Sequence, residues 1–150
     1  MKVSCRTQYA VRVMLYLAGH SGAGHVQLHD IARAEHISAK FLGQIVLPLR
    51  RRGLLRAARG ARGGYALGKE PREISVEDIV EAVEGVIALA ERPGRAGAAT
   101  AAARCIKHHV WRRASRVLRR ELAAVTLDDL CRLQRHFHDA APAGTIEYVI

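Results

Sequence analysis

Residues 37–67 read ISAKFLGQIVLPLRRRGLLRAARGARGGYAL, and they combine a predicted helix with a predicted hairpin. Ser38 is well placed to cap the start of the helix, because its hydroxyl can accept a free backbone N–H. One apolar stripe follows along this helix, formed by Leu42, Ile45 and Leu49. Gly53 ends the helix, and the apolar period then shortens. Residues 54–58 and 65–67 predict two short strands, joined by a turn whose glycines permit a positive φ.

Pro48 lies inside the predicted helix and conflicts with it. Proline lacks a backbone N–H, and its ring crowds the carbonyl four residues earlier, which here belongs to Gln44. We therefore expect the helix to kink or tighten at this point.

Helical patterns flank this segment on both sides, and no other segment is typical of a strand. The predicted helices cover residues 7–18, 28–35, 76–85 and 106–124, and a short one follows Thr126. Residues 91–104 contain no large apolar side chain and predict a long loop, with an extra helical turn in the alanine run as the alternative. The predicted order is two helices, a turn, a third helix and a two-stranded wing. This is the order of a winged helix-turn-helix, so we predict a mainly α fold of this type.

Basic residues are concentrated in two windows of the sequence. The 150-residue chain has 24 Lys+Arg against 14 Asp+Glu, and its net charge of +10 favours a polyanionic partner such as nucleic acid or an anionic membrane. Between Glu35 and Glu70 there are eight bases and no acid, and between Glu91 and Glu121 there are nine bases and no acid. A charge run is usually only a solvated helix face. The first window, however, coincides with the helix and hairpin described above.

Targeting and compartment signals point to the cytoplasm. No apolar stretch approaches the ~20 residues of a membrane-spanning helix, and the N-terminus has no apolar signal core, so we expect neither a membrane partner nor export. Three dispersed cysteines, Cys5, Cys105 and Cys131, do not form a disulfide framework.

The helix after Ser38 and the hairpin turn predict a surface that reads double-stranded DNA. Short or polar side chains suit the major groove, and the candidates there are Ser38, Ala39, Lys40 and Gln44. Gln44 can bond adenine through two hydrogen bonds. The turn can place a guanidinium from Arg59 or Arg62 into the adjacent minor groove. The expected phosphate contacts are Arg50, Arg51, Arg52 and Arg56.

Other functions find less support in the sequence. The histidines form no His-Glu-x-x-His motif, the glycine run at 60–64 lacks the Lys-Ser/Thr of a phosphate loop, and no nucleophile lies near a base, so we predict that the protein is not an enzyme. The main rival is a general polyanion- or RNA-binding module, which would use stacking aromatics that this chain, at 5% aromatic residues, lacks.

Several motifs resemble the IscR/NsrR-type family of bacterial regulators over roughly residues 1–135. They are residues 2–4, 9–12, 37–42, 49–55, 59–67, 79–85, 110–111 and 125–130. The resemblance implies a homodimeric transcriptional regulator, acting mostly as a repressor, whose long helix crosses that of its partner. Trp111, Leu118 and Leu122 would supply the apolar seam, with packing inside one subunit as the alternative. It also implies a division into a DNA-binding domain (1–85), a sensor-type loop (86–105), dimerisation and docking helices (106–135) and a tail (136–150).

The resemblance raises the question of an iron–sulfur cluster. Family members that sense iron, nitric oxide or redox state hold one with three loop cysteines, sometimes completed by a histidine, and thiolates suit such clusters. Here only the last cysteine is present, Cys105, with His108 three residues later. Three alternatives stay open: a different ligand set drawn from His108, His109 and Glu91, engineered replacement of cysteines by alanine, or a cluster-free regulator.

Overall fold

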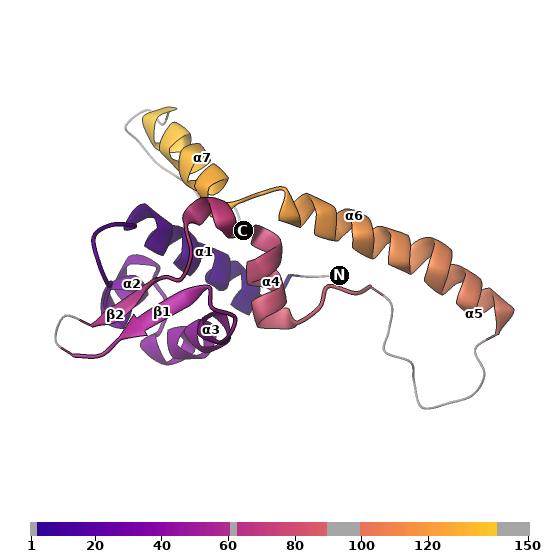
Figure 1. Cartoon of the computed structure of the whole chain (residues 1–150), viewed down its shortest axis with the longest axis horizontal. Helices are drawn as coiled ribbons and strands as arrows, with labels where there is room; N and C mark the ends of the chain where they lie inside the picture. Colours follow the sequence, from indigo (N-terminus) through magenta and orange to yellow (C-terminus); the bar gives the residue numbers. More distant parts are fainter. Residues whose placement is uncertain (1–2, 61–62, 90–99, 141–150) are drawn as a thin grey trace.

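The computed structural model describes residues 3–60, 63–89 and 100–140, and it is mainly helical. Its elements are α1 (Cys5–Gly19), α2 (Leu28–Ala34), α3 (Ala39–Arg51), β1 (Leu55–Ala58), β2 (Gly64–Leu67), η1 (Pro71–Glu73), α4 (Val76–Glu84), α5 (Ala101–Ile106), η2 (Lys107–Trp111), α6 (Arg112–Ala123) and α7 (Leu127–Ala140). Helices α1–α4 and the hairpin form a compact body, from which α5, η2 and α6 project as one long helix (Figure 1). The predicted fold class is confirmed.

Hydroxyl side chains begin the helices, as the sequence indicates. Ser38 Oγ accepts the Phe41 N–H at 3.2 Å, which satisfies one free donor in the first turn of α3. Ser75 and Asp78 form a reciprocal capping box at the start of α4. These bonds are local in sequence, which is why the starts of α3 and α4 are predictable.

One apolar cluster holds the body together. Its fully buried members come from every helix of the body and from the start of α7, and include Met14, Ile31, Leu42, Ile45, Leu49, Leu55, Ile74, Ile79 and Leu127. Helix α1 lies at the centre, because α3, α4, β2 and α7 all pack against it. The recognition-type helix α3 therefore rests on a rigid support.

The hairpin is antiparallel and is tied to the segment before α2. Leu55 pairs with Leu67 and Ala58 with Gly64. Val26 adds a bridge that the sequence did not predict: it exchanges two backbone hydrogen bonds with Tyr65, at 2.8 and 2.9 Å. Gly64 makes this approach possible, because a Cβ at its position would lie 2.3 Å from the Val26 carbonyl oxygen.

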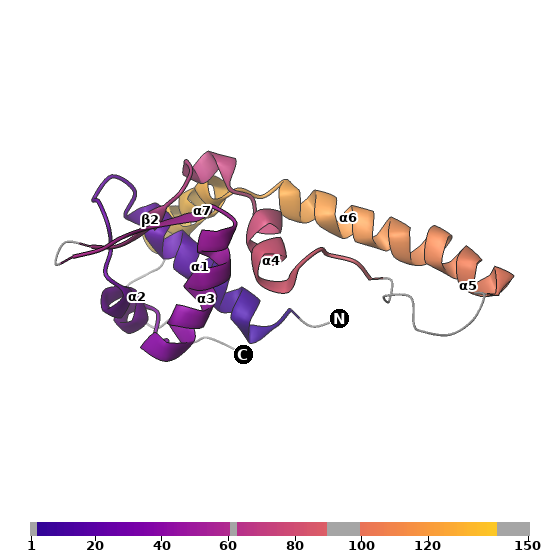
Figure 2. The same ribbon diagram turned by 60° about the horizontal axis from the view of Figure 1, so that its bottom comes forward.

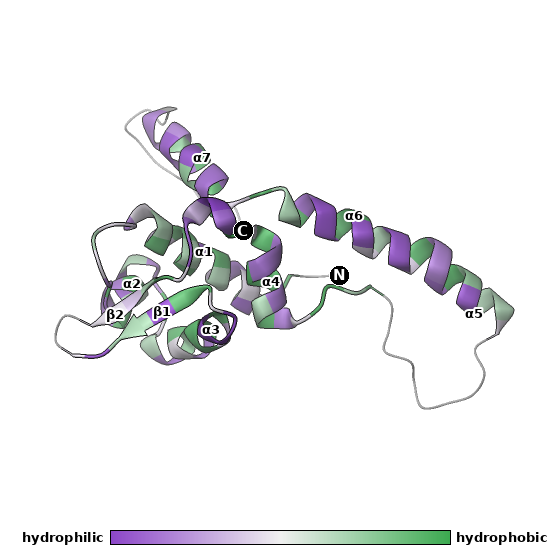
Figure 3. Ribbon diagram, in the orientation of Figure 1, coloured by the Kyte–Doolittle hydropathy of each residue, from purple (hydrophilic) through white to green (hydrophobic). Residues whose placement is uncertain are grey.

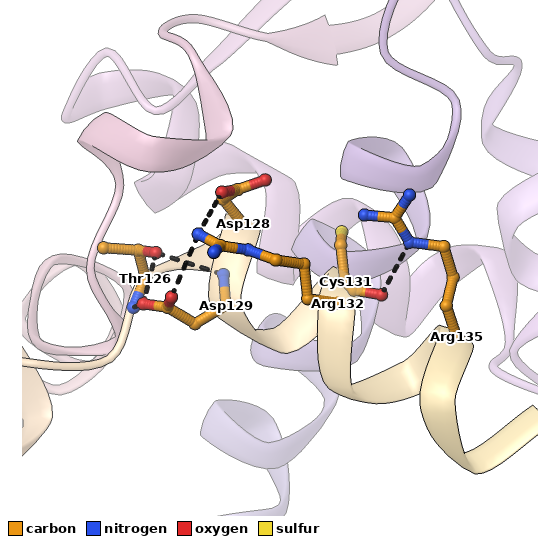
Figure 4. A network of polar contacts seen from close by, with 6 residues as sticks. All are labelled: Thr126, Asp128, Asp129, Cys131, Arg132 and Arg135. Atoms are coloured by element: carbon orange, nitrogen blue, oxygen red, sulfur yellow. Dashed lines mark hydrogen bonds and ion pairs between the residues drawn. The ribbon is translucent and has the colours of Figure 1, made fainter. Parts of the chain in front are cut away.

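The C-terminal helices are longer than predicted. The long helix begins at Ala101 rather than near 106, which confirms the alternative of an extra helical turn in the alanine run. Its Lys107–Trp111 turn is a π-helix. Helix α7 continues to Ala140, past residue 135, beyond which we expected a tail. Figure 4 shows how α7 begins: Asp129 accepts from both the N–H and the hydroxyl of Thr126. Arg132 then bonds Asp128 one turn later.

Figure 2 shows the wing and the free end of the long helix at opposite ends of the molecule. Among the described residues, no helix combines the length and the apolar character needed to traverse a bilayer.

Candidate nucleic-acid interface

Helix α3 separates its buried and exposed residues as the sequence predicts. Leu42, Ile45, Val46 and Leu49 are buried. The proposed base-reading residues Ser38, Ala39, Lys40 and Gln44 are all exposed. The Ser38 hydroxyl accepts the cap bond from Phe41, and its proton stays free to donate.

Pro48 is accommodated by a side chain from another helix. Because Pro48 has no N–H, the Gln44 carbonyl loses its usual partner within α3. Arg6 of α1 supplies the replacement, with its Nη2 donating to Gln44 O at 2.8 Å. The role of Arg6 was not predicted from the sequence, although a proline inside a helix indicates that the carbonyl four residues earlier lacks its helical hydrogen-bond donor. The backbone of a proposed base-reading residue is thus clamped to the central helix.

The turn between α2 and α3 is held by a second arginine of α1. Arg12 donates through Nε to Glu35 Oε2 and through Nη2 to Glu35 O, both at 2.9 Å, and lies 5.2 Å from the centre of the Tyr9 ring. The next residue, His36, adopts φ 54°, in the left-handed region. The pair therefore ties the end of α2 to α1, next to the turn that leads into α3.

The predicted phosphate and minor-groove contacts lie at the end of α3 and on the hairpin. Arg50, Arg51, Arg52, Arg56 and Arg59 are all exposed. Within the described ranges, none of them forms an ion pair with a carboxylate. Arg56 Nε is partly used, donating to the Leu67 carbonyl at 3.1 Å, whereas Arg62 lies outside the described residues.

Backbone contacts fix the hairpin against α3. The Leu54 N–H donates to Leu49 O at 3.0 Å, and the Gly68 N–H donates to Leu54 O at 2.8 Å. A Cβ on Gly68 would lie 2.1 Å from the Gly53 carbonyl oxygen, so only glycine fits this approach. Helix α3 packs against β1, and Figure 1 shows the two elements next to each other in the body. The two predicted DNA-reading elements are therefore neighbours in the fold.

The predicted seam residues of the long helix point in different directions. Trp111 is 44% exposed. Leu118 and Leu122 instead line an apolar groove of about 590 Å³ with Val76 and Val80 of α4. Apolar patches recur between hydrophilic ones along the long helix (Figure 3). Its exposed large apolar residues include three that sequence reasoning missed, Ile106, Val110 and Val117, at 47–55% exposure.

The donors near the long helix do not fit an iron–sulfur cluster. Cys105 and His108 are both exposed, and His108 Nδ1 lies 3.1 Å from Arg112 Nη1. In the part of the chain that the structure describes, no three His, Cys, Asp or Glu side chains converge on a possible metal position. Glu91 lies outside the described residues, and residues 90–99 contain no cysteine or histidine. One thiolate and one imidazole fall short of the four ligands that such a cluster takes.

Comparisons with known proteins agree with this arrangement. The profile of the Rrf2 family, described as an iron-dependent transcriptional regulator, matches residues 3–133. The chain is 38% identical to the HTH-type transcriptional regulator IscR of Pectobacterium carotovorum, over 87% of this chain and 79% of that protein. It is 36% identical to the regulator CymR of Bacillus subtilis, over 87% and 89% of the two chains.

Two solved structures share the fold. The structure of CymR, the global cysteine regulator of B. subtilis, superposes with a TM-score of 0.73 at 34% identity, covering 89% of this chain and 98% of that one. T. potens IscR gives a TM-score of 0.71 at 32% identity, covering 96% and 94%.

Proposed function

The chain belongs to the Rrf2 family of transcriptional regulators, and from this premise we propose that it binds a specific double-stranded DNA operator as a homodimer and acts mostly as a repressor. The observation that carries the proposal is the placement of α3 beside the hairpin, with exposed basic side chains on both. A regulator of this kind acts in the cytoplasm, on the chromosome.

The side chains of α3 and the wing have different roles in this proposal. Gln44, on the exposed face of α3, reads a base edge in the major groove, and Ser38 and Lys40 bind bases or phosphates. The wing places Arg59 in the adjacent minor groove, with Arg62 as its expected partner. The remaining arginines, Arg50, Arg51, Arg52 and Arg56, bind phosphates and provide affinity that depends little on sequence.

The apolar side chains that the long helix leaves in solvent support the proposed dimerisation. Ile106, Val110 and Val117 are about half exposed on a helix that projects from the body, and Trp111 lies on the same helix. We propose that this helix crosses its copy, burying these side chains. The two α3 helices would then reach successive major grooves of one operator.

The test is a gel-shift series on a selected operator and on random duplex. Gln44→Ala and Arg59→Ala should weaken operator binding by about 5- to 100-fold and leave random-duplex binding nearly unchanged. Arg51→Ala should weaken both and lower the salt slope by about one. Equal losses on both duplexes for all three variants would favour a general polyanion- or RNA-binding module instead.

We propose a cluster-free regulator, because the donors present fall short of a conventional cluster that would sense iron, nitric oxide or redox state. The donor set around Cys105 and His108 is the supporting observation. Anaerobically purified protein should show no charge-transfer absorption in the blue region and no stoichiometric iron. A blue-region band that disappears in Cys105→Ser would overturn this part of the proposal.

A further inference from the structure

A hollow of about 550 Å³ lies between α6 and the segment that follows α4. One wall is formed by Val86, Ile87 and Ala88, and the other by side chains of the long helix, namely His108, Arg112, Ser115, Arg116 and Arg119. Among the described residues, no carboxylate lines it. The hollow therefore pairs an apolar wall with a wall rich in positive charge and N–H donors.

The arginines of this wall differ in how far their charge is balanced. Arg119 donates to Glu77 at 2.6 Å and lies 3.3 Å from Glu81, so two carboxylates of α4 neutralise it. Arg112 lies 3.1 Å from the imidazole of His108, and neither Arg112 nor Arg116 forms an ion pair within the described ranges. Two guanidinium groups one helical turn apart thus line the hollow with no acidic partner among the described residues.

The neighbouring polar groups are held in defined orientations. Because an arginine can only donate, the 3.1 Å contact from Arg112 requires His108 Nδ1 to accept, which leaves Nε2 as an N–H donor. Ser115 Oγ accepts the Leu89 N–H and donates to Trp111 O, both at 2.8 Å, and so fixes the apolar wall to the helix. The π-helical turn at Lys107–Trp111 lies at the same place, and such turns occur frequently at functional sites.

We propose that this hollow binds a small organic anion, whose carboxylate or phosphate group lies between Arg112 and Arg116 and whose carbon skeleton lies on Val86 and Ile87. Guanidinium groups match both oxyanions, because each can donate two parallel hydrogen bonds. The Nε2–H of His108 is a third donor.

Ligand binding would act on DNA affinity through the two walls of the hollow. The apolar wall continues directly from α4, which packs on α3, whereas the other wall is the projecting helix. A ligand that draws the walls together changes the angle between the DNA-reading body and the long helix, and with it the spacing of two half-sites. This regulatory consequence rests on the proposed function, whereas the binding itself does not.

The binding test uses Trp111, the one tryptophan of the chain, which lies on the π-helical turn. Its fluorescence is titrated with inorganic phosphate and, separately, with hexanoate, against chloride at equal ionic strength. We expect a saturable response to at least one anion, and the stronger response identifies the head group. Arg112→Gln/Arg116→Gln should weaken this binding by about tenfold or more. Arg113→Gln/Arg120→Gln is the matched control, since it removes the same charge from the same helix outside the hollow.

Three outcomes overturn the site: no saturable response to either anion, an unchanged affinity in Arg112→Gln/Arg116→Gln, or equal losses in both double variants. A gel shift with and without the bound anion then tests the coupling to DNA. We expect operator affinity to change about fivefold or more in the wild type and not in Arg112→Gln/Arg116→Gln. Anion binding without this change would overturn the regulatory role alone. Because the fluorescence titration contains no DNA, its result is independent of the proposed operator binding.

Discussion

Arg6 and Pro48 should be energetically coupled, although they lie on different helices. Arg6 Nη2 donates to the Gln44 carbonyl that Pro48 leaves without a partner. A hydrogen bond to a charged group contributes about 1.5–3 kcal/mol, and the exposure of Arg6 reduces this to about 1 kcal/mol, because water competes for the carbonyl. We therefore expect Arg6→Met to lower the free energy of unfolding by about 1 kcal/mol.

Pro48→Ala should remove the need for this arginine. Alanine restores an N–H at position 48, which can bond Gln44 O within α3. A proline inside a helix costs about 3 kcal/mol relative to alanine. The hydrogen bond from Arg6 to Gln44 O already offsets part of this cost, so Pro48→Ala should stabilise the protein by about 1–2 kcal/mol. In that background, Arg6→Met should cost no more than about 0.3 kcal/mol.

Urea denaturation of wild type, Arg6→Met, Pro48→Ala and the double variant measures this coupling. All four are measured at one protein concentration, since self-association would make the unfolding midpoint depend on concentration. Arg50→Met is the control, because Arg50 is an exposed arginine that forms no ion pair within the described residues, so its loss should cost about the same in both backgrounds. If Arg6→Met costs the same amount with and without Pro48, the proposed replacement of the helical hydrogen bond is refuted.

Three further predictions concern stability, each measured by denaturation. Gly43→Ala should stabilise the protein by about 1 kcal/mol, because a Cβ at this position meets nothing within 4 Å. Gly68→Ala should destabilise it strongly, because a Cβ there would meet the Gly53 carbonyl. A Gly43→Ala variant less stable than Gly68→Ala would contradict this packing. His36→Gly should stabilise by about 0.5–1 kcal/mol by relieving its positive φ, and a loss of stability would show that the imidazole contributes more than the strain costs. Hydrogen bonds from Ser4 and Thr7 lower the pKa of Glu84 below 4.5, so its contribution is complete above that pH and is lost as the pH falls through the lowered pKa. Wild type should therefore lose stability more steeply than Glu84→Gln below about pH 5, and parallel curves would rule out this linkage.

The fold was predictable because its signals are local. Ser38 and Ser75 cap the helices that follow them, and the glycines and short apolar runs after Gly53 specify the hairpin. Each of these signals depends on residues within a few positions of one another. Where the signal was weak, as in the alanine run before Cys105, the helix start was misplaced by about one turn.

The candidate DNA-reading residues were predictable for the same reason. Apolar periodicity alone decides which face of α3 is buried, and it leaves Lys40 and Gln44 exposed. Arg6 escaped prediction because its partner is a backbone carbonyl 38 positions away. A basic residue at an exposed position of α1 has no sequence signal that distinguishes this contact from free solvation.

Local chemistry therefore decided the order of helices, their caps and the arginine-rich wing. Only tertiary packing decided how these parts are used. The apolar residues of the long helix formed by α5, η2 and α6 follow one helical pattern, yet α4 covers Leu118 and Leu122 and leaves Val110 and Val117 in solvent. Likewise, Glu77 and Glu81 of α4 neutralise Arg119 but not Arg116, which has no ion pair in the described part of the chain. Periodicity predicts that a helix has faces, but only the position of a neighbouring helix determines which of them remain free to bind.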